Sequence, residues 1–170
     1  SEGVLQACAG VLKDTPLPDG LQVESHAHPS DDLIQASQVL NENMGVAPSP
    51  AYYLRGHDVP SMLTCVHDAN GEMAACASAS MRYHRDGPLA GWLFAGGVSV
   101  HPNHRRLGLG SLVNAALLTD SHKQYQWVCA LEQAKADNAP SVGMIERCGL
   151  TQDNAKITVV ISLTGDSLTR

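Results

Sequence analysis

The feature that most constrains the fold is the passage from an apolar run through a glycine-rich turn into a helix, between residues 93 and 117. Leu93 to Val100 is an apolar run typical of a buried strand, and the sequence HPNHRRLGLGSL of residues 101–112 follows it. Apolar residues then repeat at helical spacing and predict one apolar face about four turns long: Leu109, Leu112, Val113, Ala116 and Leu117. This strand–turn–helix unit indicates a fold that combines a sheet with helices.

The turn itself predicts an anion site. The first N–H groups of a helix have no internal partner, and together with the helix dipole they attract anions. Arg105 and Arg106 add charged hydrogen-bond donors, and Gly108 and Gly110 allow a phosphate to approach the backbone closely. A pyrophosphate is therefore the expected ligand. A plain glycine-containing turn is the alternative. The sequence has no Gly-x-x-x-x-Gly-Lys-Ser/Thr loop, and Val113 stands where the dinucleotide-binding fingerprint needs glycine.

The remaining pattern predicts alternating helices and strands. Helices are expected over residues 4–12, 30–45 and 141–148, and residues 46–60 form a loop or a short helix. Strands are expected over residues 21–25, 62–67, 72–84, 93–100, 127–131 and 156–163, with a tight turn at the sequence DANG. Gly96 and Gly97 inside a strand indicate a bulge or the close approach of another molecule. This order predicts a mixed sheet with helices on its faces.

Composition narrows the function classes. The chain has 170 residues, a net charge of −6 and 16% charged residues, which favours a folded domain and disfavours a nucleic-acid partner. Five cysteines without Cys-x-x-Cys spacing, and histidines without paired spacing, predict buried thiols and no metal site. No membrane-spanning stretch or signal peptide is evident, so a cytoplasmic location is expected. The first residue is Ser1 rather than methionine, which leaves open a segment upstream.

Two segments resemble the GCN5-related N-acetyltransferase (GNAT) superfamily. Val98-Ser-Val-His-Pro102 followed by Arg105-x-x-Gly108-x-Gly110 resembles the acyl-CoA-binding segment of that family. Asp137-Asn-Ala-Pro-Ser141 and Glu146-Arg-Cys-Gly-Leu150 resemble its second signature, in the expected order. The resemblance implies an α/β (α+β) fold: a mixed, mostly antiparallel sheet with helices on both faces and a splayed central pair of parallel strands. It places the acyltransferase domain at residues 20–170, after an N-terminal helical extension at residues 1–19.

The resemblance also implies acetyl-CoA as co-substrate, without a metal. The pantetheine is expected in the gap between the splayed strands. The residues expected to hold the cofactor are Val98, Val100, Arg105, Arg106, Gly108, Leu109, Gly110, Ser111 and Asn138. Gly108→Val is expected to weaken coenzyme A binding by about tenfold or more with the fold intact.

The catalytic groups are less sharply indicated. Many family members protonate the leaving thiolate from a tyrosine, but Ile145 occupies that position here, and Ser141 one turn earlier is the candidate substitute. Glu132, at the end of a strand, and His84, at the end of another, are candidate bases. Tyr52 and Tyr53 are candidates for an aromatic wall beside a cationic amine. Each of these residues has an ordinary structural role as the alternative.

The expected function is transfer of an acetyl or similar short acyl group from acetyl-CoA to a primary amine of a small molecule or peptide. The alternative is a sensor or regulatory domain of the same fold that holds acyl-CoA without turnover, because Ile145 replaces the usual tyrosine. No nucleic-acid or membrane partner is expected. The acceptor and the oligomeric state stay open, although a homodimer is common among proteins of this kind.

Overall fold

The computed structural model describes residues 1–153, and within them five strands form one sheet in the order β1-β2-β3-β4-β5. The strands are Gln22–His26 (β1), Ser61–His67 (β2), Met73–Ser80 (β3), Trp92–Val100 (β4) and Cys129–Leu131 (β5). The first four pair antiparallel, and only β4 and β5 run parallel. The predicted mixed sheet is confirmed. The strand expected over residues 156–163 lies outside the described residues.

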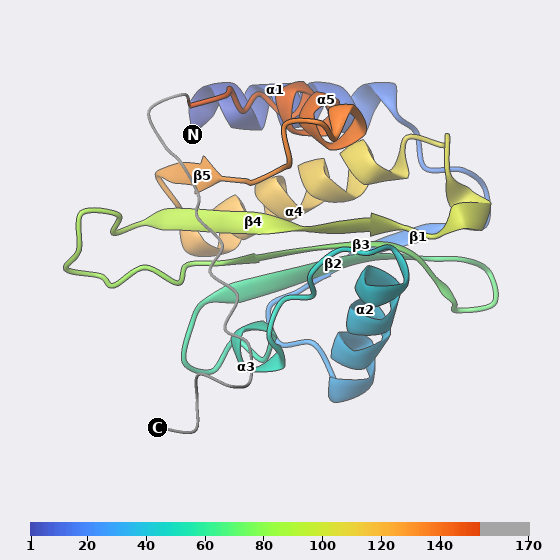
Figure 1. The fold of residues 1–170 in the computed structure, drawn as a ribbon, viewed down its shortest axis with the longest axis horizontal. Helices are drawn as coiled ribbons and strands as arrows, with labels where there is room; N and C mark the ends of the chain where they lie inside the picture. The colour runs from blue at the N-terminus through green and yellow to red at the C-terminus, as the bar shows by residue number, and fades with distance from the viewer. Residues whose placement is uncertain (154–170) are drawn as a thin grey trace.

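Helices cover both faces of the sheet (Figure 1). One face carries α1 (Glu2–Asp14), α4 (Leu109–Tyr125) and α5 (Ala139–Arg147), and the other carries α2 (Asp31–Asn43) and the short α3 (Ala51–Leu54). The main core lies between the sheet and α4, where Leu93, Ala95, Val113 and Leu117 are fully buried. No helix within residues 1–153 is long and apolar enough to cross a membrane.

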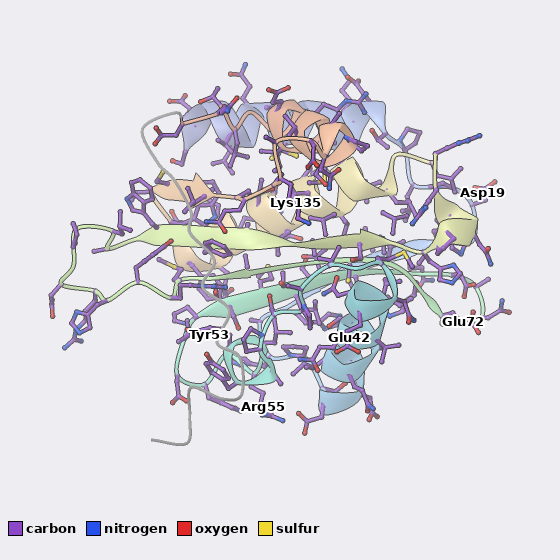
Figure 2. All side chains as sticks on the ribbon, viewed as in Figure 1. Asp19, Glu42, Tyr53, Arg55, Glu72 and Lys135 are labelled. Carbon is purple, nitrogen blue, oxygen red and sulfur yellow. The ribbon has the colours of Figure 1, made fainter. Side chains whose placement is uncertain are left out.

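Local sequence explains where these elements begin. Ser30 caps α2 as predicted, because its hydroxyl accepts a hydrogen bond from the N–H of Leu33 at 3.3 Å. The turn at DANG is also confirmed: the Asp68 carboxylate accepts hydrogen bonds from the N–H groups of Asn70 and Glu72 between β2 and β3. Figure 2 places Glu42 and Tyr53 on the α2–α3 side of the sheet.

Strand β3 ends earlier than the sequence predicts. Its last pair joins Ser80 to Ser61, the first residue of β2, and Pro60 precedes that pair. Pairing with β2 therefore stops at Ser80, although β4 continues to Trp92, and residues 81–91 form a loop. The placement of His84 at a strand end is wrong, because His84 lies four residues beyond β3.

Candidate active site

The glycine-rich turn presents open backbone donors, as the sequence predicts. After β4, a short 3-10 turn at Pro102–His104 leads to Arg106 and Gly108, which both adopt left-handed conformations (φ 66° and 75°). The first bond of helix α4 joins the N–H of Leu112 to the carbonyl of Gly108 at 3.1 Å, and no side chain caps this end. The N–H groups of Leu109, Gly110 and Ser111 precede that bond, so the helix offers them no acceptor.

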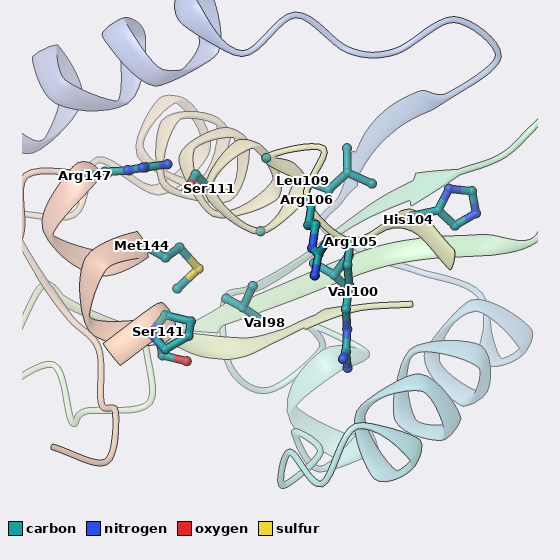
Figure 3. Close-up of a pocket in the computed structure, with 13 residues that line it drawn as sticks. Val98, Val100, His104, Arg105, Arg106, Leu109, Ser111, Ser141, Met144 and Arg147 are labelled. Atoms are coloured by element: carbon teal, nitrogen blue, oxygen red, sulfur yellow. The ribbon is translucent and has the colours of Figure 1, made fainter. Parts of the chain in front are cut away.

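A cavity of about 420 Å³ opens in front of this turn, between the end of β4, the start of α4 and α5 (Figure 3). Three arginines and a histidine are among its 13 lining residues and none of the 13 is acidic, although the whole chain carries a net charge of −6. Such a lining favours an anionic guest. Eight of the nine residues predicted to hold a cofactor line it: Val98, Val100, Arg105, Arg106, Gly108, Leu109, Gly110 and Ser111.

Helix α5 closes the other side of this cavity. Ser141, predicted as a catalytic group, lines it together with Met144 and Arg147, which the sequence reasoning missed. Their spacing of three residues places all three on one helix face, and that periodicity could have identified them. Asn138 does not line the cavity; its side chain caps α5 by accepting a hydrogen bond from the N–H of Ser141 at 3.3 Å. Ile145 lies on another side of α5, beside a separate small cavity.

Strand β4 separates from β5 beside the cavity. The two strands pair only from Trp92–Cys129 to Phe94–Leu131. Between Ser78–Gly96 and Cys76–Ser99, β4 contains one more residue than β3, which is a β-bulge at the glycine pair. Residues 95–100 of β4 therefore have no partner on the β5 side among residues 1–153. The predicted bulge and the splayed strand pair are confirmed.

The bulge also changes which side chains face each helix layer. Before it, Leu93 and Ala95 face α4; after it, Val98 and Val100 pack on that side, and Ser99 turns toward α2 to donate a hydrogen bond to Asn41 at 2.6 Å. One added residue reverses the alternation of a strand. As a result, β4 lines the 420 Å³ cavity with Val98 and Val100 and a second pocket with Phe94 and Gly96.

That second pocket, of about 200 Å³, lies at the bulge on the α2–α3 side. Its lining includes Gly97 (φ 62°), Ser49 and Ser78, and the two serine hydroxyls are 2.7 Å apart. Among residues 1–153, neither a carboxylate nor a histidine lines it. The residues of this range that line it are Ala47, Pro48, Ser49, Pro50, Ser78, Arg82, Phe94, Gly96 and Gly97.

The two tyrosines expected to form an aromatic wall lie side by side on α3, and their role in acceptor binding stays a prediction. The guanidinium of Arg82 lies over the ring of Tyr53, 4.9 Å from its centroid. Tyr52 is 58% exposed, and its ring centroid is 4.3 Å from that of Tyr53. A cation of the protein itself therefore occupies a face of Tyr53, and neither tyrosine lines the 200 Å³ pocket.

Glu132 is a partly buried carboxyl. Burial raises its pKa to about 7, and the hydrogen bond that it accepts from Nδ2 of Asn114 at 2.9 Å opposes this rise. Such a pKa suits a base near neutral pH. Its position suits a structural role. Glu132 does not line the 420 Å³ cavity; it lines another cavity of about 390 Å³ with Trp92 and Gly149, and it is hydrogen-bonded to the buried Asn114 of α4. A catalytic role for Glu132 stays a prediction.

His84 lies apart from the other candidates. Its side chain is 78% exposed, and its Nδ1 is 3.8 Å from a carboxylate oxygen of Asp86 in the same loop. His84 lines neither the 420 Å³ cavity nor the pocket at the bulge. Among residues 1–153 no group of three potential ligands is placed to hold a metal ion.

The fold itself requires glycine at position 108, apart from the predicted role of Gly108 in binding a phosphate. Its φ of 75° suits glycine, and a Cβ at this position would lie 2.7 Å from Cγ2 of Thr15. The fold is therefore not expected to tolerate Gly108→Val unchanged. We expect Gly108→Ala to lower the free energy of unfolding by about 1–3 kcal/mol, measured by urea unfolding without ligand. If Gly108→Ala were as stable as the wild-type protein, the strain expected from the positive φ and the contact with Thr15 would be contradicted.

Comparisons with known proteins agree with this architecture. The model of the acetyltransferase (GNAT) family matches residues 31–150. No curated protein sequence matches the chain. Three solved structures with low sequence identity share the fold.

The aminoglycoside N-acetyltransferase AAC(6')-Iy, solved with a bisubstrate analogue, has a TM-score of 0.62 at 14% identity, over 85% of this chain and 98% of its own. Glucosamine-6-phosphate N-acetyltransferase from Arabidopsis thaliana has a TM-score of 0.58 at 15% identity, over 83% and 99%. A tandem GNAT protein of the clavulanic acid biosynthesis pathway has a TM-score of 0.60 at 20% identity, over 82% of this chain. The chain spans 45% of the length of that tandem protein.

Proposed function

Because the chain belongs to the acetyltransferase (GNAT) family, we propose that it transfers an acetyl or similar short acyl group from acetyl-CoA to a primary amine of a small molecule or peptide. The observation that carries this proposal is the basic cavity at the start of α4, where open N–H groups meet the gap beside β4.

The residues present fit coenzyme A. The amides of Leu109, Gly110 and Ser111 and the side chain of Arg106 would hold its pyrophosphate. A Cβ at Gly110 would lie within 4 Å of Val100 and Met144, so the glycine keeps space open in the cavity. The unpaired edge of β4 would bind the amide groups of the pantetheine as an added strand would. When bound, acetyl-CoA supplies the activated acyl group.

Ser141 is the proposed proton donor for the leaving thiolate. It lines the cavity from the first turn of α5, one turn before Ile145, which faces elsewhere. Asn138 positions this turn through its bond to the N–H of Ser141. This role requires a hydroxyl at the cavity wall, and Ser141 supplies one there.

The pocket at the bulge is the proposed place for the acceptor amine. It adjoins Gly96 and Gly97 on β4, the strand that also lines the cofactor cavity. The described residues that line it supply hydroxyl groups and an arginine but no carboxylate or histidine, so these residues provide no strong base. Positioning of an already neutral amine then supplies much of the rate enhancement. The structural neighbours named for aminoglycoside and glucosamine-6-phosphate acetylation support a small acceptor.

The experiment is an assay of acetyl transfer from acetyl-CoA to a panel of small primary amines and short peptides. Acetylated product should be measured by mass spectrometry, because the five free cysteines would interfere with thiol reagents. We expect turnover with at least one small amine. Tight coenzyme A binding without transfer to any acceptor would favour the acyl-CoA sensor, and absence of coenzyme A binding would contradict both functions.

A further inference from the structure

We propose that Arg82 binds an anionic group of the acceptor, so that the preferred substrate is a small amine that also carries a carboxylate or a phosphate. The inference rests on the proposed function and names the substrate class of its acceptor pocket. It adds an anionic group to the amine for which Tyr52 and Tyr53 were expected to form an aromatic wall.

The guanidinium of Arg82 is held in a fixed orientation. Its central carbon lies 4.0 Å from the ring centroid of Phe94 and 4.9 Å from that of Tyr53. Its Nε donates a hydrogen bond to the hydroxyl of Ser80 at 3.0 Å. Aromatic rings that contact a guanidinium favour its planar faces and leave its edge free to donate hydrogen bonds. Little side-chain freedom is then left to lose on binding an anion.

The terminal N–H groups of Arg82 have no protein acceptor among the described residues. None of the ion pairs there includes Arg82: the acidic side chain of Asp31 pairs with Arg55, and that of Asp86 with His84 and Arg85. A half-buried guanidinium without a carboxylate partner is unusual, because desolvation of a charge is ordinarily offset by pairing. Two parallel N–H donors on one edge match the oxygens of a carboxylate or phosphate.

The location connects this charge to the proposed reaction. Arg82 lines the 200 Å³ pocket with Gly96 and Gly97 of the bulge, and it also lines a neighbouring pocket of about 610 Å³ with Tyr83 and Met81. Phe94, on which the guanidinium lies, is two residues before Gly96, or about 7 Å along a strand. An acceptor with its amine at the bulge and its anion on Arg82 is therefore a small molecule.

The test uses pairs of amines that differ in one anionic group: 4-aminobutanoate against 4-aminobutanamide, and 3-aminopropyl phosphate against 3-aminopropanol. Rates of acetyl transfer and dissociation constants in the presence of coenzyme A are measured for each. In the wild-type protein we expect the anionic member of at least one pair to bind about 10- to 100-fold more tightly than its neutral partner. The pair that shows this preference identifies carboxylate or phosphate as the group.

Substitution of Arg82 should remove this preference. Arg82→Gln is expected to raise the KM of the anionic amine by about 10- to 100-fold and to leave that of its neutral partner nearly unchanged. Arg82→Lys keeps the charge without the planar edge and should restore part of the preference. Arg55→Gln is the matched control, because Arg55 lines neither of the two pockets that Arg82 lines and its Nε pairs with Asp31 at 3.0 Å, so both values should stay unchanged.

The outcomes separate this inference from the proposed function. If no amine is acetylated, the proposed function fails, and the dissociation constants still decide whether Arg82 selects anions. Equal affinity for the charged and neutral members of both pairs in the wild-type protein would overturn the inference even if turnover is found. If folded Arg82→Gln lost affinity for the charged and the neutral amine equally, this result would also overturn the inference. Arg82 would then have a packing role alone.

Discussion

Gly110→Val should lower the affinity for coenzyme A by about 10- to 100-fold while the protein stays folded. A Cβ at Gly110 would lie 3.6 Å from Cγ2 of Val100 and 3.8 Å from Sδ of Met144, which are ordinary contact distances. Both neighbours line the cavity in front of α4, so a branched side chain would fill space that the proposed cofactor needs. Titration calorimetry with coenzyme A measures this loss directly.

The matched control for this variant is Gly10→Val. Gly10 is also a helical glycine, in α1, and a Cβ there meets no atom within 4 Å. The control should bind coenzyme A as the wild-type protein does, and thermal unfolding without ligand should show both variants folded. If folded Gly110→Val and Gly10→Val bind coenzyme A equally, the cavity is not the cofactor site, and the proposed function loses the observation that carries it.

Glu132→Gln should stabilise the protein above neutral pH, by about 1–3 kcal/mol at pH 8, and have little effect at pH 4. Burial raises the pKa of Glu132 to about 7 from an ordinary value of 4.5. Between these values the folded protein holds a proton that the unfolded chain has released, so wild-type stability falls as the pH rises through this window. Glutamine is neutral throughout and can still accept the hydrogen bond from Asn114.

Urea unfolding from pH 4 to pH 8 measures this difference. Glu42→Gln, on the exposed part of α2, is the control and should differ little from the wild-type protein at every pH. A constant difference between Glu132→Gln and wild type across this range would contradict the raised pKa. The same variant tests catalysis: a large loss of kcat with unchanged coenzyme A affinity would identify Glu132 as the base, whereas retained turnover would leave it a structural group.

The strand–turn–helix unit around residues 93–117 shows how much of the site local sequence can predict. Glycine at Gly108 and the arginines beside it define a helix start with open donors, and those properties depend on a few adjacent residues. The same local reasoning identified the Ser30 cap, the turn at Asp68 and the bulge at Gly96 and Gly97. It failed for the end of β3, because that end depends on where β2 begins.

In the sequence by itself, the resemblance of two segments indicated the family. Capping, turn chemistry and periodicity predicted the order of most elements and the residues around the anion site, because they act between near neighbours. Only the tertiary structure decided that Arg82 lies on Phe94 and Tyr53, that Glu132 accepts a hydrogen bond from the buried Asn114, and that α5 contributes Met144 and Arg147 to the cavity. These contacts join residues that are distant in the chain. Local patterns in the sequence cannot predict them, because the residues meet only when the sheet and its helices have packed together.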